Sequence, residues 1–85
     1  MASIDPIYLV TDFKTVPDST TGGYACVYHT TQHQTREAAD SRYFEALASA
    51  ARNTTNPKMG AILFTDEGQR LDSKCYILGE EQQQS

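Results

Sequence analysis

Residues 35–52 read TREAADSRYFEALASAAR, and this stretch decides the fold because it carries the clearest helical pattern in the chain. Residues 36–52 are mostly good helix formers and include six alanines. Thr35 is the expected N-cap, and Asn53 is expected to end the helix in a left-handed conformation. The sequence therefore predicts one helix over residues 36–52.

Apolar side chains recur along this helix at spacings of three and four, which is the pattern of an amphipathic helix. One face is therefore expected to pack on a sheet, while the other faces water. The predicted buried stripe consists of Tyr43, Leu47, Ala50 and Ala51, flanked by Ala39, Phe44 and Ala46.

Two strands are predicted before the helix, at residues 7–14 and 24–30. Both are rich in β-branched and aromatic residues that alternate between two faces. Residues 15–23 between them contain a Pro-Asp-Ser sequence and two glycines, which favour turns. This connection is expected to be a mobile, exposed loop, and the two strands are expected to pair antiparallel.

Two further strands are predicted after the helix, at residues 58–65 and 69–78. The first is the most continuously apolar segment of the chain, as expected for a central strand. Residues 66–68 fit a short turn with Gly68 at a positive φ. The predicted fold is α+β in the order β-β-α-β-β, with a four-stranded antiparallel sheet of two hairpins and one amphipathic helix. Residues 1–79 are expected to form a single domain, and residues 80–85 a disordered, acidic and Gln-rich tail.

A single helix covers only one face of such a sheet. Depending on register, either Tyr8 and Val10 or Tyr24 and Tyr28 lie on the uncovered face. An apolar face left bare is unusual in a soluble protein of this size. We therefore expect a homodimer or a higher oligomer, formed through the sheet face or an exposed edge strand.

Composition narrows the function classes. The net charge is -4 and the seven Lys and Arg residues are dispersed, so direct nucleic-acid binding is not expected. No apolar run is long enough for a membrane span, and the first residues do not resemble a signal peptide. The expected location is the cytoplasm, where Cys26 and Cys75 would remain thiols.

The sequence offers little support for catalysis or metal binding. Cys26, His29, His33 and Cys75 include the ligand types of a zinc site, but Cys26 and His29 are an odd number of residues apart on one strand and point to opposite faces. No carboxylate is obviously placed to orient either imidazole. The phosphate-binding and dinucleotide motifs are also absent. We predict a protein that is not an enzyme, with no catalytic residue, metal or cofactor.

Aromatic and basic residues suggest a ligand site instead, because such side chains stack on a base and hold a phosphate. The alternative is that the tyrosines are half-buried sheet residues with solvated hydroxyls. The candidate ligand-binding residues are Tyr8, Tyr24, Tyr28, Arg42, Arg70, Lys74 and Tyr76.

From Thr35 to Tyr76 the sequence has an Ala-rich helical stretch with an aromatic pair, then an apolar strand, an acidic turn ending in Gly, and a closing strand with a late Tyr. On this pattern the chain resembles a loose group of very short phage and prophage proteins of unknown function, although Phe44 stands where such proteins commonly have His. The resemblance covers about half of the chain, and its residues mostly serve the fold. They are Ala38 and Ala39, Tyr43 and Phe44, Leu47 and Ala48, the apolar residues 61–64, the turn 66–68, and Cys75 with Tyr76.

The resemblance implies a viral origin, a place in the host cytoplasm, and action against host defence by stoichiometric binding. The first hypothesis is a non-enzymatic inhibitor of bacterial immunity that sequesters a nucleotide-derived signal as an oligomer. A second is a protein inhibitor of a host defence effector, similar to anti-CRISPR proteins. A small structural or interaction protein is a further alternative, and a small enzyme or metalloprotein ranks last.

Overall fold

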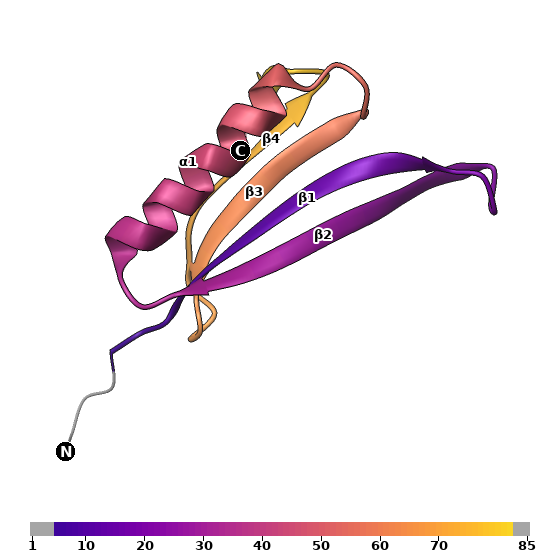
Figure 1. Ribbon diagram of the computed structural model, residues 1–85. Coiled ribbons are helices and arrows are strands. Elements are labelled where there is room, and N and C mark those ends of the chain that lie inside the picture. Colours follow the sequence, from indigo (N-terminus) through magenta and orange to yellow (C-terminus); the bar gives the residue numbers. More distant parts are fainter. Residues whose placement is uncertain (1–4, 83–85) are drawn as a thin grey trace.

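The computed structural model describes residues 5–82 and is an α+β fold with one helix, as predicted. Its five strands form one antiparallel sheet in the order β2-β1-β3-β4-β5, and the helix lies against one face of that sheet (Figure 1). Along the chain the elements are β1 (Tyr8–Asp18), β2 (Gly23–His33), α1 (Arg36–Arg52), β3 (Lys58–Thr65), β4 (Arg70–Ile77) and β5 (Glu80–Gln82).

The predicted sheet of four strands is one strand short, because residues 80–82 fold back onto β4. Leu78 (φ 51°) and Gly79 (φ 85°) form a two-residue turn with both residues at positive φ. Leucine rarely adopts this conformation, so the sequence gives little sign of the turn. The prediction of a disordered tail is therefore wrong for residues 80–82, and residues 83–85 lie outside the described part of the chain.

The β1–β2 hairpin is longer than predicted, because residues 15–18 continue β1 and the loop contains only residues 19–22. Pairing between β1 and β3 ends at Thr15 and Lys58. Beyond that point β1 has a strand neighbour on one side only, where Pro17, which has no N–H, is tolerated. The predicted mobile loop over residues 15–23 is thus mostly strand.

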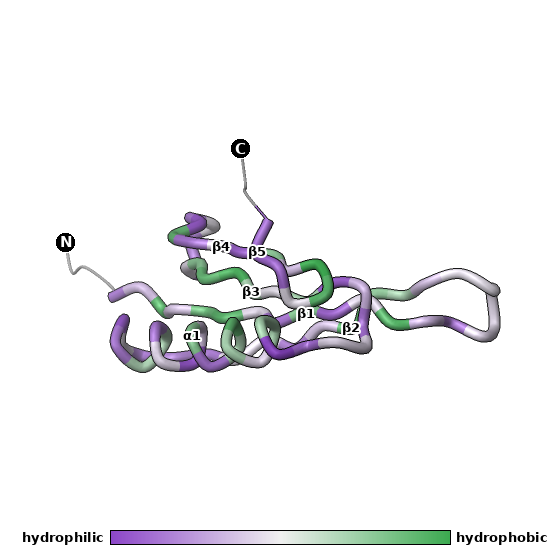
Figure 2. Tube along the Cα trace, turned by 90° about the horizontal axis from the view of Figure 1, so that it is seen from above, coloured by the Kyte–Doolittle hydropathy of each residue, from purple (hydrophilic) through white to green (hydrophobic). Residues whose placement is uncertain are grey.

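The outer half of this hairpin projects past the helix and past the end of β3 (Figures 1 and 2). The molecule is correspondingly elongated, with extents of 53 × 25 × 23 Å. Gly23 and Tyr24, at the start of β2, are exposed on this overhang.

The core lies between α1 and the sheet face that the helix covers, mainly over β1 and β3. Of the predicted helix stripe, Tyr43, Leu47 and Ala50 are buried as expected, whereas Ala51 is exposed and Phe44 is 61% exposed. Phe44 follows Tyr43 by one position, which rotates it about 100° around the helix and away from the sheet. The core cluster consists of Val10, Ala39, Tyr43, Ala46, Leu47, Ala61 and Leu63, with Tyr8, Leu71 and Tyr76 packed against it.

The two helix ends differ in how well they were predicted. The Thr35 hydroxyl accepts a hydrogen bond from the Ala38 N–H at 3.2 Å, which confirms the N-cap. Asn53 is extended (φ -69°, ψ 132°), so the left-handed end is wrong. Its side chain accepts from the Asn56 N–H at 3.0 Å and donates to the Asn56 carbonyl at 2.6 Å, an arrangement that turns the chain without a left-handed residue.

The strand register also decides which residues lie on the sheet face away from the helix, here called the open face. Val10 is buried beneath the helix, and Tyr8 shares its face. Phe13 and its partner Tyr28 lie on the open face, as does Tyr24 further along β2. Of the two alternatives left by the sequence, the uncovered pair is therefore Tyr24 and Tyr28.

Gly60 makes a close approach possible on the open face. A side chain at this position would meet the Lys74 carbonyl and come within 2.6 Å of the Phe13 ring. Glycine therefore lets the Phe13 ring lie across β3, which is how sheets commonly cover a strand glycine.

Candidate functional site

A groove of about 350 Å³ lies between α1 and the base of the projecting hairpin. Its polar lining comes from Asp12 and Lys14 of β1, His29 of β2, and Arg42 and Ser49 of α1. Its apolar lining is formed by Val27, Ala46 and Met59.

Strand alternation and register place these side chains in the groove. Asp12 and Lys14 follow Val10 at spacings of two and four, so they share its face beneath the helix. The register pairs Asp12 with His29 and Lys14 with Val27. The groove exists because the hairpin continues past the point where the core ends.

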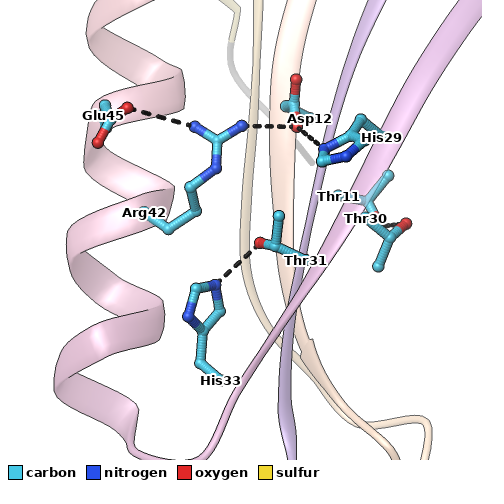
Figure 3. A network of polar contacts seen from close by, with 8 residues as sticks. All are labelled: Thr11, Asp12, His29, Thr30, Thr31, His33, Arg42 and Glu45. Carbon is cyan, nitrogen blue, oxygen red and sulfur yellow. Dashed lines mark hydrogen bonds and ion pairs between the residues drawn. The ribbon is translucent and has the colours of Figure 1, made fainter.

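Arg42 ties the helix to the hairpin. Its guanidinium donates a hydrogen bond to Asp12 Oδ1 at 3.0 Å, and it lies 3.9 Å from Glu45 Oε1 on the same helix (Figure 3). The Arg42 side chain is only 26% exposed. A guanidinium held in this way keeps further N–H donors available for a ligand.

His29 lies on the other side of Asp12. Its Nδ1 is 3.8 Å from Asp12 Oδ1, and its side chain is largely exposed (Figure 3). A carboxylate that the sequence did not point to therefore lies near His29, although the separation is too long for a hydrogen bond that would orient the ring. The cause is the register, which sets Asp12 directly opposite His29.

Ser49 lines the same groove, so serine, histidine and aspartate occur together there. Among residues 5–82, however, no hydrogen bond links Ser49 to His29, and the His29–Asp12 separation exceeds hydrogen-bond range. A nucleophile of this type needs both links. These three side chains are therefore not connected as nucleophile, base and orienting carboxylate within residues 5–82.

The charge of the groove differs from that of the whole molecule. Two permanent cations, Lys14 and Arg42, line it with one carboxylate, Asp12, whereas the chain carries a net charge of -4. Lys14 is exposed and forms no ion pair within residues 5–82. The residues that line the groove thus carry one more cation than carboxylate, and Glu45, outside the lining, lies 3.9 Å from Arg42.

The seven predicted ligand residues do not gather at this groove. Arg42 is the one that lines it. Tyr8 and Tyr76 are partly buried against the core cluster on the same sheet face. The remaining four lie elsewhere, so the seven candidate residues do not line one common groove.

Lys74 is engaged at the opposite edge of the sheet. Its ammonium lies 3.0 Å from Glu81 Oε1, and this carboxylate raises the pKa of Lys74. The Tyr76 hydroxyl donates a hydrogen bond to the same oxygen at 3.4 Å. These two candidate residues therefore have an internal partner on β5.

Tyr24, Tyr28 and Arg70 belong to the open face. The two tyrosines are 67% and 72% exposed on β2. Arg70 is paired with Phe64 and lies on β4, with β1 and β3 between it and β2, and it donates a hydrogen bond to Ser73 Oγ at 3.4 Å. The tyrosines thus gather on the hairpin without the predicted arginine.

The cysteines and histidines lie as the strand alternation predicts. Cys26 is paired with Thr15 on the open face, while His29 faces the groove. Within residues 5–82 no three side chains of the metal-ligating types come together. Both cysteines are free in the described structure.

Sequence reasoning missed most of the groove. The alternation in residues 8–14 already placed Asp12 and Lys14 on one face, so half of the signal was available. To place His29 in the groove, one must also know the length of the hairpin loop, which sets the register of β1 and β2. To place Ser49 and Met59 there, one must know how the helix lies over the sheet.

In comparisons with known proteins, no family model, no curated protein and no solved structure matches this chain. Among the described residues, no helix has the length and hydropathy needed to cross a membrane.

Proposed function

We propose that this protein acts by binding and not by catalysis, and that its groove holds a small anionic ligand of the nucleotide class. The observation that carries this proposal is the pair of cations, Lys14 and Arg42, lining a cavity on a protein of net charge -4. Arginine and lysine are the usual partners of phosphate, and Arg42 is pre-ordered by Asp12.

The size and the apolar lining of the groove are compatible with this ligand class. Pockets for small molecules span roughly 300–1,000 Å³, and a groove of about 350 Å³ suits one nucleotide unit. Val27, Ala46 and Met59 offer apolar contacts for a ring next to the cations that would hold its phosphate.

The biological setting that we propose follows from the resemblance to short phage proteins. In that setting the protein inhibits bacterial immunity by sequestering a nucleotide-derived signal in the host cytoplasm. Sequestration needs no chemical step. It favours an oligomer, because two or more linked grooves bind a larger ligand, or several ligands, at once.

Titration calorimetry against cyclic oligonucleotides and cyclic ADP-ribose isomers tests the proposal. Lys14→Gln is expected to weaken binding about tenfold or more, since the variant loses one phosphate contact. Lys58→Gln is the matched control, because Lys58 lies on the open face, away from the groove, and binding should not change. Silence of the whole panel, or equal losses in both variants, would contradict the proposed ligand site.

A second candidate function rests on the projecting hairpin. Exposed tyrosines such as Tyr24 and Tyr28 are common anchors of protein interfaces. A direct inhibitor of a defence protein would use this surface and leave the groove empty. Pull-down from infected host lysate distinguishes the two functions, because only this one requires a stable host protein partner that survives Lys14→Gln and is lost with Tyr28→Ala.

A further inference from the structure

The two edges of the sheet differ in how they are protected against pairing with another strand. Within residues 5–82, β2 has a strand neighbour on one side only, so one row of its backbone N–H and C=O groups faces outward. The opposite edge, β5, is three residues long and carries Glu80 and Glu81. Short, charged edges of this kind resist pairing.

β2 lacks these protective features. It is 11 residues long, reads GYACVYHTTQH, and contains no proline and no Lys, Arg, Asp or Glu. It pairs with β1 from Gly23 to His33 without a register shift, so no bulge bends it away. Natural sheets rarely leave an edge of this length and composition open to solvent.

We propose that β2 pairs antiparallel with β2 of a second copy, which joins the two sheets into one across a two-fold axis. An antiparallel strand pair has its local two-fold axis perpendicular to the sheet. The register that pairs all 11 residues is centred on Tyr28, so that Tyr28 meets its own counterpart. Cys26 then lies opposite Thr30 of the second copy, and Val27 opposite His29.

Charge favours a second copy over a foreign strand as the occupant. The protein is acidic overall, yet none of its 11 acidic residues lies on β2. Two like-charged molecules approach most favourably through an uncharged edge, where no carboxylates are brought together. A charged peptide from another protein would find no ionic partner along β2.

The proposed pairing would also extend the groove, and in this respect the inference rests on the proposed function. The axis is perpendicular to the sheet, so both helices lie on the same side of the joined sheet. Val27 and His29 form the β2 wall of each groove. With Tyr28 at the axis, the Val27 and His29 side chains of both copies stand between the two grooves, and each copy contributes to the boundary of the other's site.

On the open face the same pairing would continue a row of aromatic side chains. Phe13 and Tyr28 are direct cross-strand partners, and the Phe13 ring covers Gly60. The second copy would extend this row with its own Tyr28 and Phe13. Cross-strand aromatic pairs of this type stabilise sheets, and they would shield the Tyr28 ring, now 72% exposed.

Disulfide trapping tests both the occupant and the register, and it uses no ligand. In a Cys75→Ser background, Thr30→Cys would place a thiol opposite Cys26 of the second copy, within disulfide reach. Cys26 and residue 30 of one chain are four strand positions apart, about 13 Å, and cannot bond to each other. Mild oxidation should therefore convert most of this variant to a covalent dimer of twice 9.4 kDa on a non-reducing gel.

Cys75→Ser alone is the matched control, because its remaining Cys26 thiols would lie too far apart across the axis to bond. Circular dichroism establishes that both variants are folded. Absence of a covalent dimer in the folded Thr30→Cys variant, or equal cross-linking in the control, would overturn the proposed interface. Neither result bears on calorimetric binding to the groove, so the failure of this inference and that of the proposed function are distinguishable.

Discussion

The sheet is built differently on the two sides of its central strand, β3. On the β1–β2 side the strands are 11 residues long, overhang the core and end in an uncharged edge. On the β4–β5 side the last strand is three residues long, acidic and tied to β4 by the Lys74–Glu81 ion pair. The contrast indicates that the β4–β5 side is protected by the chain's own residues, whereas the β1–β2 side is open to a ligand or a partner.

Two neighbouring helix residues, Arg42 and Tyr43, show the same difference. Arg42 reaches β1 and donates a hydrogen bond to Asp12 at the edge of the groove. Tyr43 is 1% exposed in the core, and its hydroxyl has no hydrogen-bond partner in the described structure. Of these two neighbours, Arg42 is thus partly accessible and has a hydrogen-bond partner, whereas the Tyr43 hydroxyl is enclosed without one.

The largest effect is expected from Leu47→Ala, because Leu47 lies in the one core that supports both sides. Loss of a buried leucine costs about 2–5 kcal/mol, which is a large share of the stability of a domain this small. Both hairpins should melt together at a much lower temperature. A melting temperature within a degree or two of wild type would mean that the two sides do not depend on a common core.

The local sequence was enough to predict the helix and the α+β class. Thr35, the alanines and the spacing of Tyr43 and Leu47 act within a few residues of one another, so their effect is visible without tertiary structure. Pro17 misled the prediction, because a proline usually ends a strand, and only the short length of β3 explains why it is tolerated here. β5 was also not predicted, because the turn before it needs Leu78 at a positive φ, which leucine rarely adopts.

The candidate site could be predicted only in part. Residue types drew attention to tyrosines and cations, but their positions depend on strand order and register, which join segments far apart in the chain. Arg70 and Tyr28 share a face yet are separated by β1 and β3. Conversely, Asp12, His29 and Arg42 come from three different elements and meet only in the folded protein.

Tyr43→Phe is expected to have a smaller effect at neutral pH, within about 1 kcal/mol, since it removes a buried hydroxyl that has no partner. Burial, assisted by the nearby Asp72 carboxylate, raises the pKa of Tyr43 well above its ordinary value of about 10. The unfolded chain therefore loses this proton first, and the stability of wild type should fall as the pH rises above about 10.

Denaturant melts of wild type and Tyr43→Phe between pH 8 and pH 11 would measure this difference. The variant should keep more of its stability above about pH 10, because phenylalanine has no hydroxyl whose ionisation favours the unfolded chain. Parallel curves for the two proteins would show that Tyr43 is not enclosed on the β4 side as described.

The smallest effect is expected from Glu81→Gln at the protected edge. The substitution breaks the ion pair with Lys74, in which both side chains are about half exposed. Exposed pairs contribute little to stability, so the melting temperature should fall by at most a few degrees. The molecular mass in solution should stay unchanged; an increase in mass would indicate that the charge on β5 was suppressing strand pairing.

The central claim is that the β2 edge is completed by a second copy, and light scattering coupled to size exclusion tests it most directly. At micromolar concentration the wild-type protein should have twice the chain mass of 9.4 kDa, and Tyr28→Lys, which sets two like charges together at the axis, should return it to 9.4 kDa. A wild-type mass of 9.4 kDa, or a dimer that survives Tyr28→Lys unchanged, would contradict the account.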